Sequence, residues 1–137
     1  MSYRVLPHTA DTGIEGTAET LDALIAVMSL GMFELVGRCK ALSPRRWLTL
    51  TIDAGTVEDL LVDTLSELLY LSETEDLLFC DFQVSVEPAE PVAKVEVGGV
   101  PTSAVEPAGP PIKAVTYHDL VVERREGRWY GRVYFDV

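Results

Sequence analysis

Carboxylate groups near the two ends of the chain are the residues best suited to chemistry. Asp11 follows residues 7–10, and Asp136 precedes Val137, whose α-carboxylate adds a third acidic group. Carboxylate oxygens are the hard ligands that Ca²⁺ and Mg²⁺ prefer in proteins. If the two ends of the chain meet, these three groups form a site for a divalent cation. Ca²⁺ and Mg²⁺ are both cations that would suit such a site.

Each of the two aspartates also has a plainer interpretation. Asp11 could accept backbone hydrogen bonds and cap a turn, which is what most loop aspartates do. Asp136 could be a solvated residue on a frayed terminus. However, Val133 and Phe135 share one face of the predicted final strand, which favours an end held in a sheet. Three carboxylates brought together would repel one another and recruit a proton or a cation.

Two further residues are candidates for supporting roles. His8 lies beside the predicted metal site, where it could orient Asp11 or serve as a core histidine bonded to backbone; the sequence does not favour either. Lys113 shares a predicted strand face with Val115 and Tyr117. It could be an edge lysine that keeps the strand soluble, or a contact to a partner's carboxylate or a nucleotide phosphate. Spacing alone favours the edge lysine.

Other kinds of site have little support in the sequence. No serine or cysteine nucleophile accompanies a histidine and an acid as in a hydrolase triad, and Gly98-Gly99 fits no phosphate-binding loop. A hydrolase that uses a metal-activated water would lack a convincing general base beyond His8. The only cysteines, Cys39 and Cys80, are too far apart in sequence for a zinc knuckle. We expect both to be reduced, with Cys80 in the core, because disulfide-rich secreted domains use more cysteines.

Composition limits the classes of partner. The net charge of −11, from 22 acidic and 11 basic side chains, disfavours broad binding to nucleic acid. An acidic surface suits a basic protein partner, although charge alone is explained as well by solubility. A chain of 137 residues predicts one domain over residues 1–137. No apolar run approaches the roughly 20 residues of a membrane helix, and no signal peptide is evident, so we expect a cytoplasmic protein without membrane contact.

The elements that would position these residues follow from periodicity and caps. Thr20 predicts the start of a helix that ends at Gly37, and the Thr56–Asp59 capping box predicts a second that runs from Val57 to about residue 71 or 72. Seven to eight strands are expected, at residues 3–6, 14–18, 47–52, 78–87, 92–97, 112–117, 120–125 and 128–137. The last two form a hairpin that turns at residues 126–127, and residues 98–111 are an exposed loop. This is an α+β fold with two amphipathic helices packed on a mostly antiparallel sheet.

Several segments together resemble one known family. Residues 8–14 read HTADTGI and match the opening HTADxGI signature of the archease family. Residues 20–35 and 60–75 are similar to the two helices of that family, and residues 113–118 and 135–137 to its closing motifs. The resemblance covers nearly the whole chain. Residues 88–111 depart from it, so no property of the family is carried over to them.

The resemblance implies a non-enzymatic cofactor protein for the GTP-dependent tRNA-splicing ligase of the RtcB type. Such proteins promote guanylylation and turnover of the ligase and broaden its use of nucleoside triphosphates. The family is described as binding Ca²⁺ through the signature aspartate and the last two residues, which implies Asp11, Asp136 and Val137 here. Its basic residue corresponds to Lys113. The alternative is a chaperone-like binding module for an RNA-modifying enzyme such as a tRNA methyltransferase.

Overall fold

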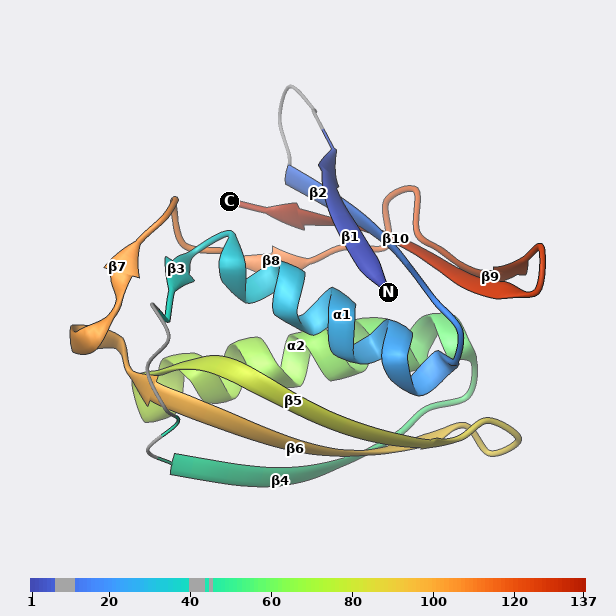
Figure 1. Cartoon of the computed structure of the whole chain (residues 1–137), viewed down its shortest axis with the longest axis horizontal. Coiled ribbons are helices and arrows are strands. Elements are labelled where there is room, and N and C mark those ends of the chain that lie inside the picture. The colour runs from blue at the N-terminus through green and yellow to red at the C-terminus, as the bar shows by residue number, and fades with distance from the viewer. Residues whose placement is uncertain (7–11, 40–43, 45) are drawn as a thin grey trace.

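The fold places two helices between two β-sheets. The computed structural model describes residues 1–6, 12–39, 44 and 46–137, so the predicted site residues His8 and Asp11 lie outside the described residues. Helix α1 (Leu21–Glu34) and helix α2 (Val57–Glu75) form the middle layer, with a five-stranded sheet on one side and a three-stranded sheet on the other (Figure 1). All strand pairs within the described residues are antiparallel. The predicted α+β class is confirmed.

The larger sheet has the order β1-β2-β10-β8, with β9 also paired to β10. Its strands are β1 (Ser2–Leu6), β2 (Thr12–Ala18), β8 (Ala114–Val115), β9 (Val121–Arg125) and β10 (Arg128–Asp136). The smaller sheet has the order β4-β6-β5, and β3 pairs with β7 in a two-stranded ribbon. These strands are β3 (Gly37–Arg38), β4 (Arg46–Asp53), β5 (Leu77–Glu87), β6 (Val92–Pro101) and β7 (Glu106–Pro107), with a short 3₁₀ helix at Thr102–Ala104.

Both helices begin where their caps predict. The Thr20 hydroxyl accepts a hydrogen bond from the Ala23 N–H at 3.1 Å, and the Thr56 hydroxyl accepts one from the Asp59 N–H at 3.0 Å. Their ends differ from the prediction. Helix α1 stops at Glu34, and Gly37 is a strand residue of β3, whereas α2 continues for about one turn beyond the predicted end.

The position of α1 between the two sheets explains its composition. Its buried residues surround most of the helix rather than forming one stripe, because both sheets contact it. They are Leu21, Leu24, Ile25, Val27, Met28, Ser29, Gly31, Met32 and Phe33. A helix enclosed in this way has few positions at which a charged side chain can reach water.

The predicted loop at residues 98–111 is partly wrong. Strand β6 continues to Pro101, and Val100 is fully buried. Glycine is required here because a Cβ at Gly98 would lie 2.9 Å from the Trp47 ring, and one at Gly99 would lie 3.0 Å from the Phe79 ring. The two glycines therefore allow close packing within the sheet, whereas their composition suggests a loop. The predicted strand at residues 112–117 is also shorter, because only Ala114–Val115 pairs.

The two cysteines are not reduced. The structure joins Cys39 to Cys80 in a disulfide with a Cα–Cα distance of 6.3 Å, which lies within the normal range. The prediction is wrong because a sequence separation of 41 residues carries no information about distance in space. Cys80 is partly buried and packs against the core, as expected.

The closing hairpin and the final strand agree with the prediction. The turn residues Glu126 and Gly127 have φ values of 51° and 78°, the left-handed backbone of a tight hairpin turn. Val133 and Phe135 are both 0% exposed, so apolar packing continues to the end of β10. Among the described residues, no helix is both long and apolar enough to cross a bilayer.

Candidate functional site

Strand pairing brings the end of the chain to the start of β2. In β10, Phe135 lies opposite Thr12 of β2, and Asp136 lies opposite Ala114 of β8. The Lys113 N–H donates a hydrogen bond of 2.8 Å to the Asp136 carbonyl oxygen. Figure 1 shows the C-terminal end between β2 and β8. We call Lys113, Asp136 and Val137 the C-terminal site.

The backbone at this site is held in place while its acidic groups face water. The Phe135 side chain is fully buried, so the alternation of the strand directs Asp136 to the opposite, outer face. Within the described residues, the Asp136 carboxylate has no hydrogen bond or ion pair. Val137 is 39% exposed. The Asp136 carboxylate is therefore presented to solvent at the end of an ordered strand, and carboxylate oxygens are ligands that hard cations prefer.

The third predicted ligand, Asp11, lies outside the described residues, as does His8. Its neighbour in sequence, Thr12, is fixed by its pairing with Phe135. In the ranges that the structure describes, no three His, Cys, Asp or Glu side chains are grouped to hold a metal ion. The convergence of Asp11 with Asp136, and the metal itself, stay predictions.

A close contact between β2 and β10 lies beside the C-terminal site. Tyr134 crosses directly over Gly13, where an added Cβ would lie 2.5 Å from the ring carbon Cε1. The Tyr134 carbonyl oxygen accepts hydrogen bonds of 3.0 Å from both the N–H and the hydroxyl of Thr116. The His118 ring lies against Tyr134, with 5.8 Å between the centroids. The prediction did not single out these residues, although Gly13, Thr116 and His118 all fall within the two quoted motifs.

Lys113 lies at the junction of β8 and α2. Its exposed side chain lines a surface pocket of about 280 Å³. The other lining residues are Ser66, Leu69, Tyr70, Glu73, Ala114 and Val115. The Lys113 backbone contacts Asp136, while the side chain faces this pocket, so the residue connects the C-terminal site with α2. The predicted shared face with Tyr117 is not formed by a strand, because β8 ends at Val115.

An acidic region of α2 holds the segment that follows β8. The Tyr117 hydroxyl donates a hydrogen bond of 2.8 Å to Asp59, and this contact raises the pKa of Tyr117. Burial raises the pKa of Asp63, and the negative charge of Asp59 adds to the effect. The hydrogen bond from Tyr117 to Asp59 thus joins the segment after β8 to the first turn of α2.

The comparisons with known proteins agree on one family. The family model described as "Archease protein family (MTH1598/TM1083)" matches residues 3–137. The chain is 32% identical over 129 residues to Protein archease of Thermococcus kodakarensis, covering 91% of each chain. It is 34% identical over 141 aligned positions to Protein archease of Methanosarcina mazei, covering 98% of this chain and 95% of the relative.

Two solved structures share the fold. The solution structure of Methanobacterium thermoautotrophicum protein 1598 matches with a TM-score of 0.85 and 25% identity, covering 98% of both chains. The crystal structure of an archease from Thermotoga maritima, described as a possible chaperone, matches with a TM-score of 0.64. It is 19% identical and covers 96% of this chain and 94% of its own, so this likeness supports the fold alone. The family match over residues 3–137 includes both end motifs, and the chain belongs to the archease family.

Proposed function

We propose that this archease is a non-enzymatic activator of the GTP-dependent tRNA-splicing ligase of the RtcB type. It promotes guanylylation and turnover of the ligase and broadens its use of nucleoside triphosphates. The activating surface is the C-terminal site, completed by Asp11. The observation that supports this proposal is the pairing of β10 with both β2 and β8, which brings residues 12–14 of the signature motif to the same sheet end as both closing motifs.

The donor set fits a divalent cation. Asp11, Asp136 and Val137 would hold the ion, most simply Ca²⁺, with Mg²⁺ or Mn²⁺ as alternatives, and backbone carbonyls and water would complete its six to eight oxygens. When bound, the ion supplies positive charge that offsets the repulsion between the carboxylates. Asp136 suits this role because its carboxylate has no competing protein partner within the described residues.

Lys113 has a separate role in this proposal. Its backbone orients Asp136 by the 2.8 Å hydrogen bond, and its side chain is free to reach a carboxylate or phosphate of the ligase complex. A lysine ammonium binds such groups as a mobile point charge. The net charge of −11 also suits a basic docking surface on an enzyme that handles RNA.

A guanylylation assay tests the proposal. Purified ligase is incubated with labelled GTP, with and without this protein, and the labelled ligase is measured over time. Wild-type protein should accelerate labelling, whereas Asp136→Asn and Asp11→Asn should abolish the acceleration and Lys113→Ala should reduce it. An extension of two residues after Val137 should also reduce it, because the α-carboxylate is displaced.

A matched control uses a distant aspartate. Asp53 is exposed at the end of β4 in the other sheet, so Asp53→Asn should retain full activation. If Asp136→Asn activates the ligase as well as Asp53→Asn does, the assignment of the C-terminal site is wrong. Isothermal titration with Ca²⁺ should show binding to the wild type and to Asp53→Asn, but not to Asp136→Asn.

The alternative is a chaperone-like binding module for an RNA-modifying enzyme such as a tRNA methyltransferase. A chaperone role is the one named for the Thermotoga maritima protein, which is described as a possible chaperone. Such a module would bind its client equally well with and without a chelator and without GTP. Pull-down of each enzyme in the presence and absence of EDTA separates the two proposals.

A further inference from the structure

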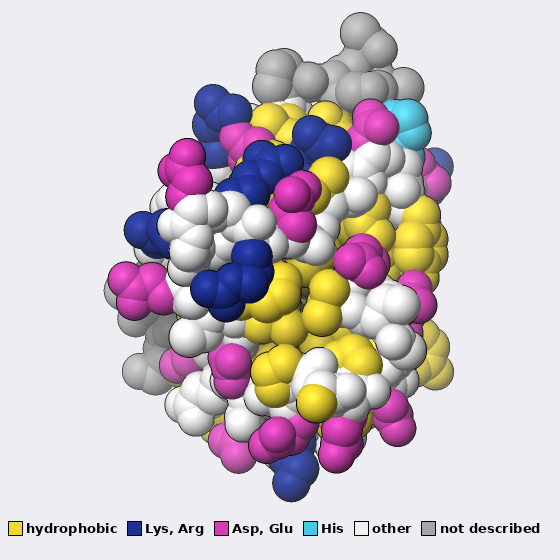
Figure 2. Space-filling view, turned by 90° about the vertical axis from the view of Figure 1, so that its right-hand side faces the viewer, with side chains coloured by type: hydrophobic (Ala, Val, Ile, Leu, Met, Phe, Trp, Pro, Cys, Tyr) yellow, Lys and Arg dark blue, Asp and Glu magenta, His cyan; other side chains and the backbone are white. Residues whose placement is uncertain are grey.

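Arginine side chains gather on the outer surface of the larger sheet. We call this the arginine surface; it comprises Arg4, Arg125, Arg128 and Arg132, from β1, β9 and β10. It holds four of the eleven basic side chains but only three of the 22 acidic ones, which are Glu15, Glu123 and Glu126. Figure 2 shows basic side chains in the upper half of the face that carries the hairpin, with acidic ones more numerous below. This surface is therefore more basic than the acidic chain as a whole.

The choice of arginine over lysine is informative. All four basic residues of this surface are arginines, whereas Lys94 and Lys113 lie on β6 and next to β8. Lysine would supply the same charge. Arginine adds a planar group that pairs with phosphate through two parallel hydrogen bonds and that stacks on flat rings. The composition thus favours a phosphate-bearing partner with planar groups over general attraction of negative charge.

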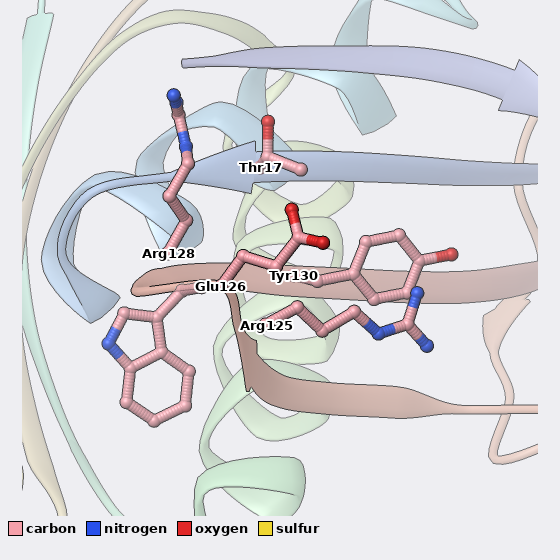
Figure 3. A pocket seen from close by; sticks show the side chains of 6 residues that line it. Thr17, Arg125, Glu126, Arg128 and Tyr130 are labelled. Carbon is pink, nitrogen blue, oxygen red and sulfur yellow. The ribbon is translucent and has the colours of Figure 1, made fainter.

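A pocket of about 630 Å³ opens at the hairpin end of this surface, where β9 turns into β10. It is lined by Thr17, Arg125, Glu126, Arg128, Trp129 and Tyr130 (Figure 3). The Arg125 guanidinium carbon lies 3.8 Å from the centroid of the Tyr130 ring, so the two planes form a stack. Tyr130 itself is only 9% exposed, which leaves the outer face of the Arg125 guanidinium as the accessible flat surface. The volume of the pocket suits a small ligand or a single nucleotide unit.

Glu15 holds the Arg125–Tyr130 stack in place. The Tyr130 hydroxyl donates a hydrogen bond of 2.6 Å to Glu15, which also pairs with Arg4. The hydrogen bond from Tyr130, followed by the contact with Arg4, lowers the pKa of Glu15. Glu15 therefore stays ionised at neutral pH and holds Tyr130 in one position. The platform is ordered before any ligand arrives, which reduces the entropy lost on binding.

Arg128 is the group available for a phosphate. Arg125 forms an ion pair with Glu123 at 3.2 Å. The guanidinium carbon of Arg124 lies 5.7 Å from the centroid of the Trp129 ring. Arg128 is exposed, and within the described residues its guanidinium has no ion pair or hydrogen bond. Figure 3 shows it on the opposite side of the opening from Arg125. A phosphate on Arg128 would thus lie across the pocket from a base on Arg125.

We propose that the arginine surface binds single-stranded nucleic acid, with Arg128 holding a phosphate and the Arg125–Tyr130 stack supporting a base. Single strands are favoured over duplex because their bases are free to stack on guanidinium planes. An acidic peptide would satisfy the charge but would not use the stack. The contact is local, so it agrees with the weak affinity for nucleic acid that the net charge predicts.

This surface is separate from the C-terminal site. Arg128 begins β10 and Asp136 ends it, and eight residues of extended strand span roughly 27 Å. The proposal does not depend on ligase activation. Arg128→Ala should leave Ca²⁺ binding and ligase guanylylation unchanged, and Asp136→Asn should leave nucleic-acid binding unchanged.

Fluorescence anisotropy of a labelled ten-nucleotide oligo(U) tests the proposal with the full-length protein. Dissociation constants are measured over a series of salt concentrations. Each phosphate contact on a single strand contributes about 0.7 to the slope of log K against log salt. Arg128→Ala should weaken binding about tenfold and reduce that slope by about 0.7. Arg125→Lys, which keeps the charge but loses the planar stack, should weaken binding with little change in slope.

Two further variants make the test discriminating. Lys94→Ala removes the same charge from an exposed position on the other sheet and should change affinity by less than twofold. Glu126→Gln removes an acid from the pocket and should strengthen binding. The proposal is overturned if no binding is detected or if Arg128→Ala behaves like Lys94→Ala. It is also overturned if a ten-residue glutamate peptide displaces oligo(U) with equal affinity, because the partner would then be an acidic protein.

Discussion

Replacing Gly13 with alanine should destabilise the protein through a clash with Tyr134. The added Cβ would lie 2.5 Å from Cε1 and 2.6 Å from Cδ1 of the ring, whereas ordinary contacts are 3.4–4 Å. The ring is only 9% exposed and lies against His118, so little free space is available to relieve the overlap. Inserting a group into a packed site of this kind costs about 1–3 kcal/mol. Part of that cost is the displacement of Tyr134 from its preferred rotamer.

Urea unfolding monitored by tryptophan fluorescence measures this cost. Gly55→Ala is the matched control, because nothing lies within 4 Å of its added Cβ. It should change the free energy of unfolding by less than about 1 kcal/mol, in either direction. Gly13→Ala should lower the midpoint without changing the slope of the transition, since the same surface is exposed on unfolding.

A double-mutant cycle identifies the cause. Tyr134→Ala removes the ring, so Gly13→Ala should cost at least about 1 kcal/mol less in that background than in the wild type. The reasoning is refuted if Gly13→Ala is as stable as Gly55→Ala, or if the effects of Gly13→Ala and Tyr134→Ala simply add. Gly13 adjoins Thr12, which pairs with Phe135. The folded Gly13→Ala protein should therefore also activate the ligase more weakly than the wild type does.

Two more predictions concern pH and redox state. Burial and the hydrogen bond to Glu34 raise the pKa of Tyr3 to about 12 from 10.0, so the stability that neutral Tyr3 supplies is complete below pH 10 and is lost as the pH rises towards 12. In alkaline titrations followed by circular dichroism, the free energy of unfolding of Tyr3→Phe should therefore fall less steeply with pH over that range than that of the wild type. An unchanged slope would contradict this. The Cys39–Cys80 disulfide encloses a 41-residue separation, so Cys39→Ser/Cys80→Ser should lower the free energy of unfolding by about 4 kcal/mol. Two titratable thiols in protein denatured without reductant would show that the bond is absent.

Local features of the fold could be predicted because they depend on residues near in sequence. Thr20 and Thr56 each cap a helix through a backbone N–H three residues later. The Glu126-Gly127 turn is read from two residues flanked by alternating strands. The burial of Val133 and Phe135 follows from alternation along one strand. In each case, the deciding interaction spans a few residues, so the local sequence is sufficient to predict the feature.

Features that depend on distant pairing could not be predicted. Gly98 and Gly99 look like loop residues until Trp47 and Phe79 pack against them from neighbouring strands. The Cys39–Cys80 bond likewise depends on where β3 and β5 lie. The length of α1 is another case, since the segment after Glu34 turns away to pair β3 with β7. These outcomes are set by which apolar faces share a core, and local propensity does not encode that choice.

The sequence by itself determined the chemical groups of both surfaces: an aspartate and a carboxylate at the chain end, and arginines around a hairpin. Only the tertiary structure decided which of them meet. The pairing of Phe135 with Thr12, and the hydrogen bond from Tyr130 to Glu15 across a separation of 115 residues, depend on β10 lying beside β2. The physical reason is that Ile14, Val133 and Phe135 are buried together against the helices, and their burial fixes the register. The outward-facing charged groups take their positions from that register.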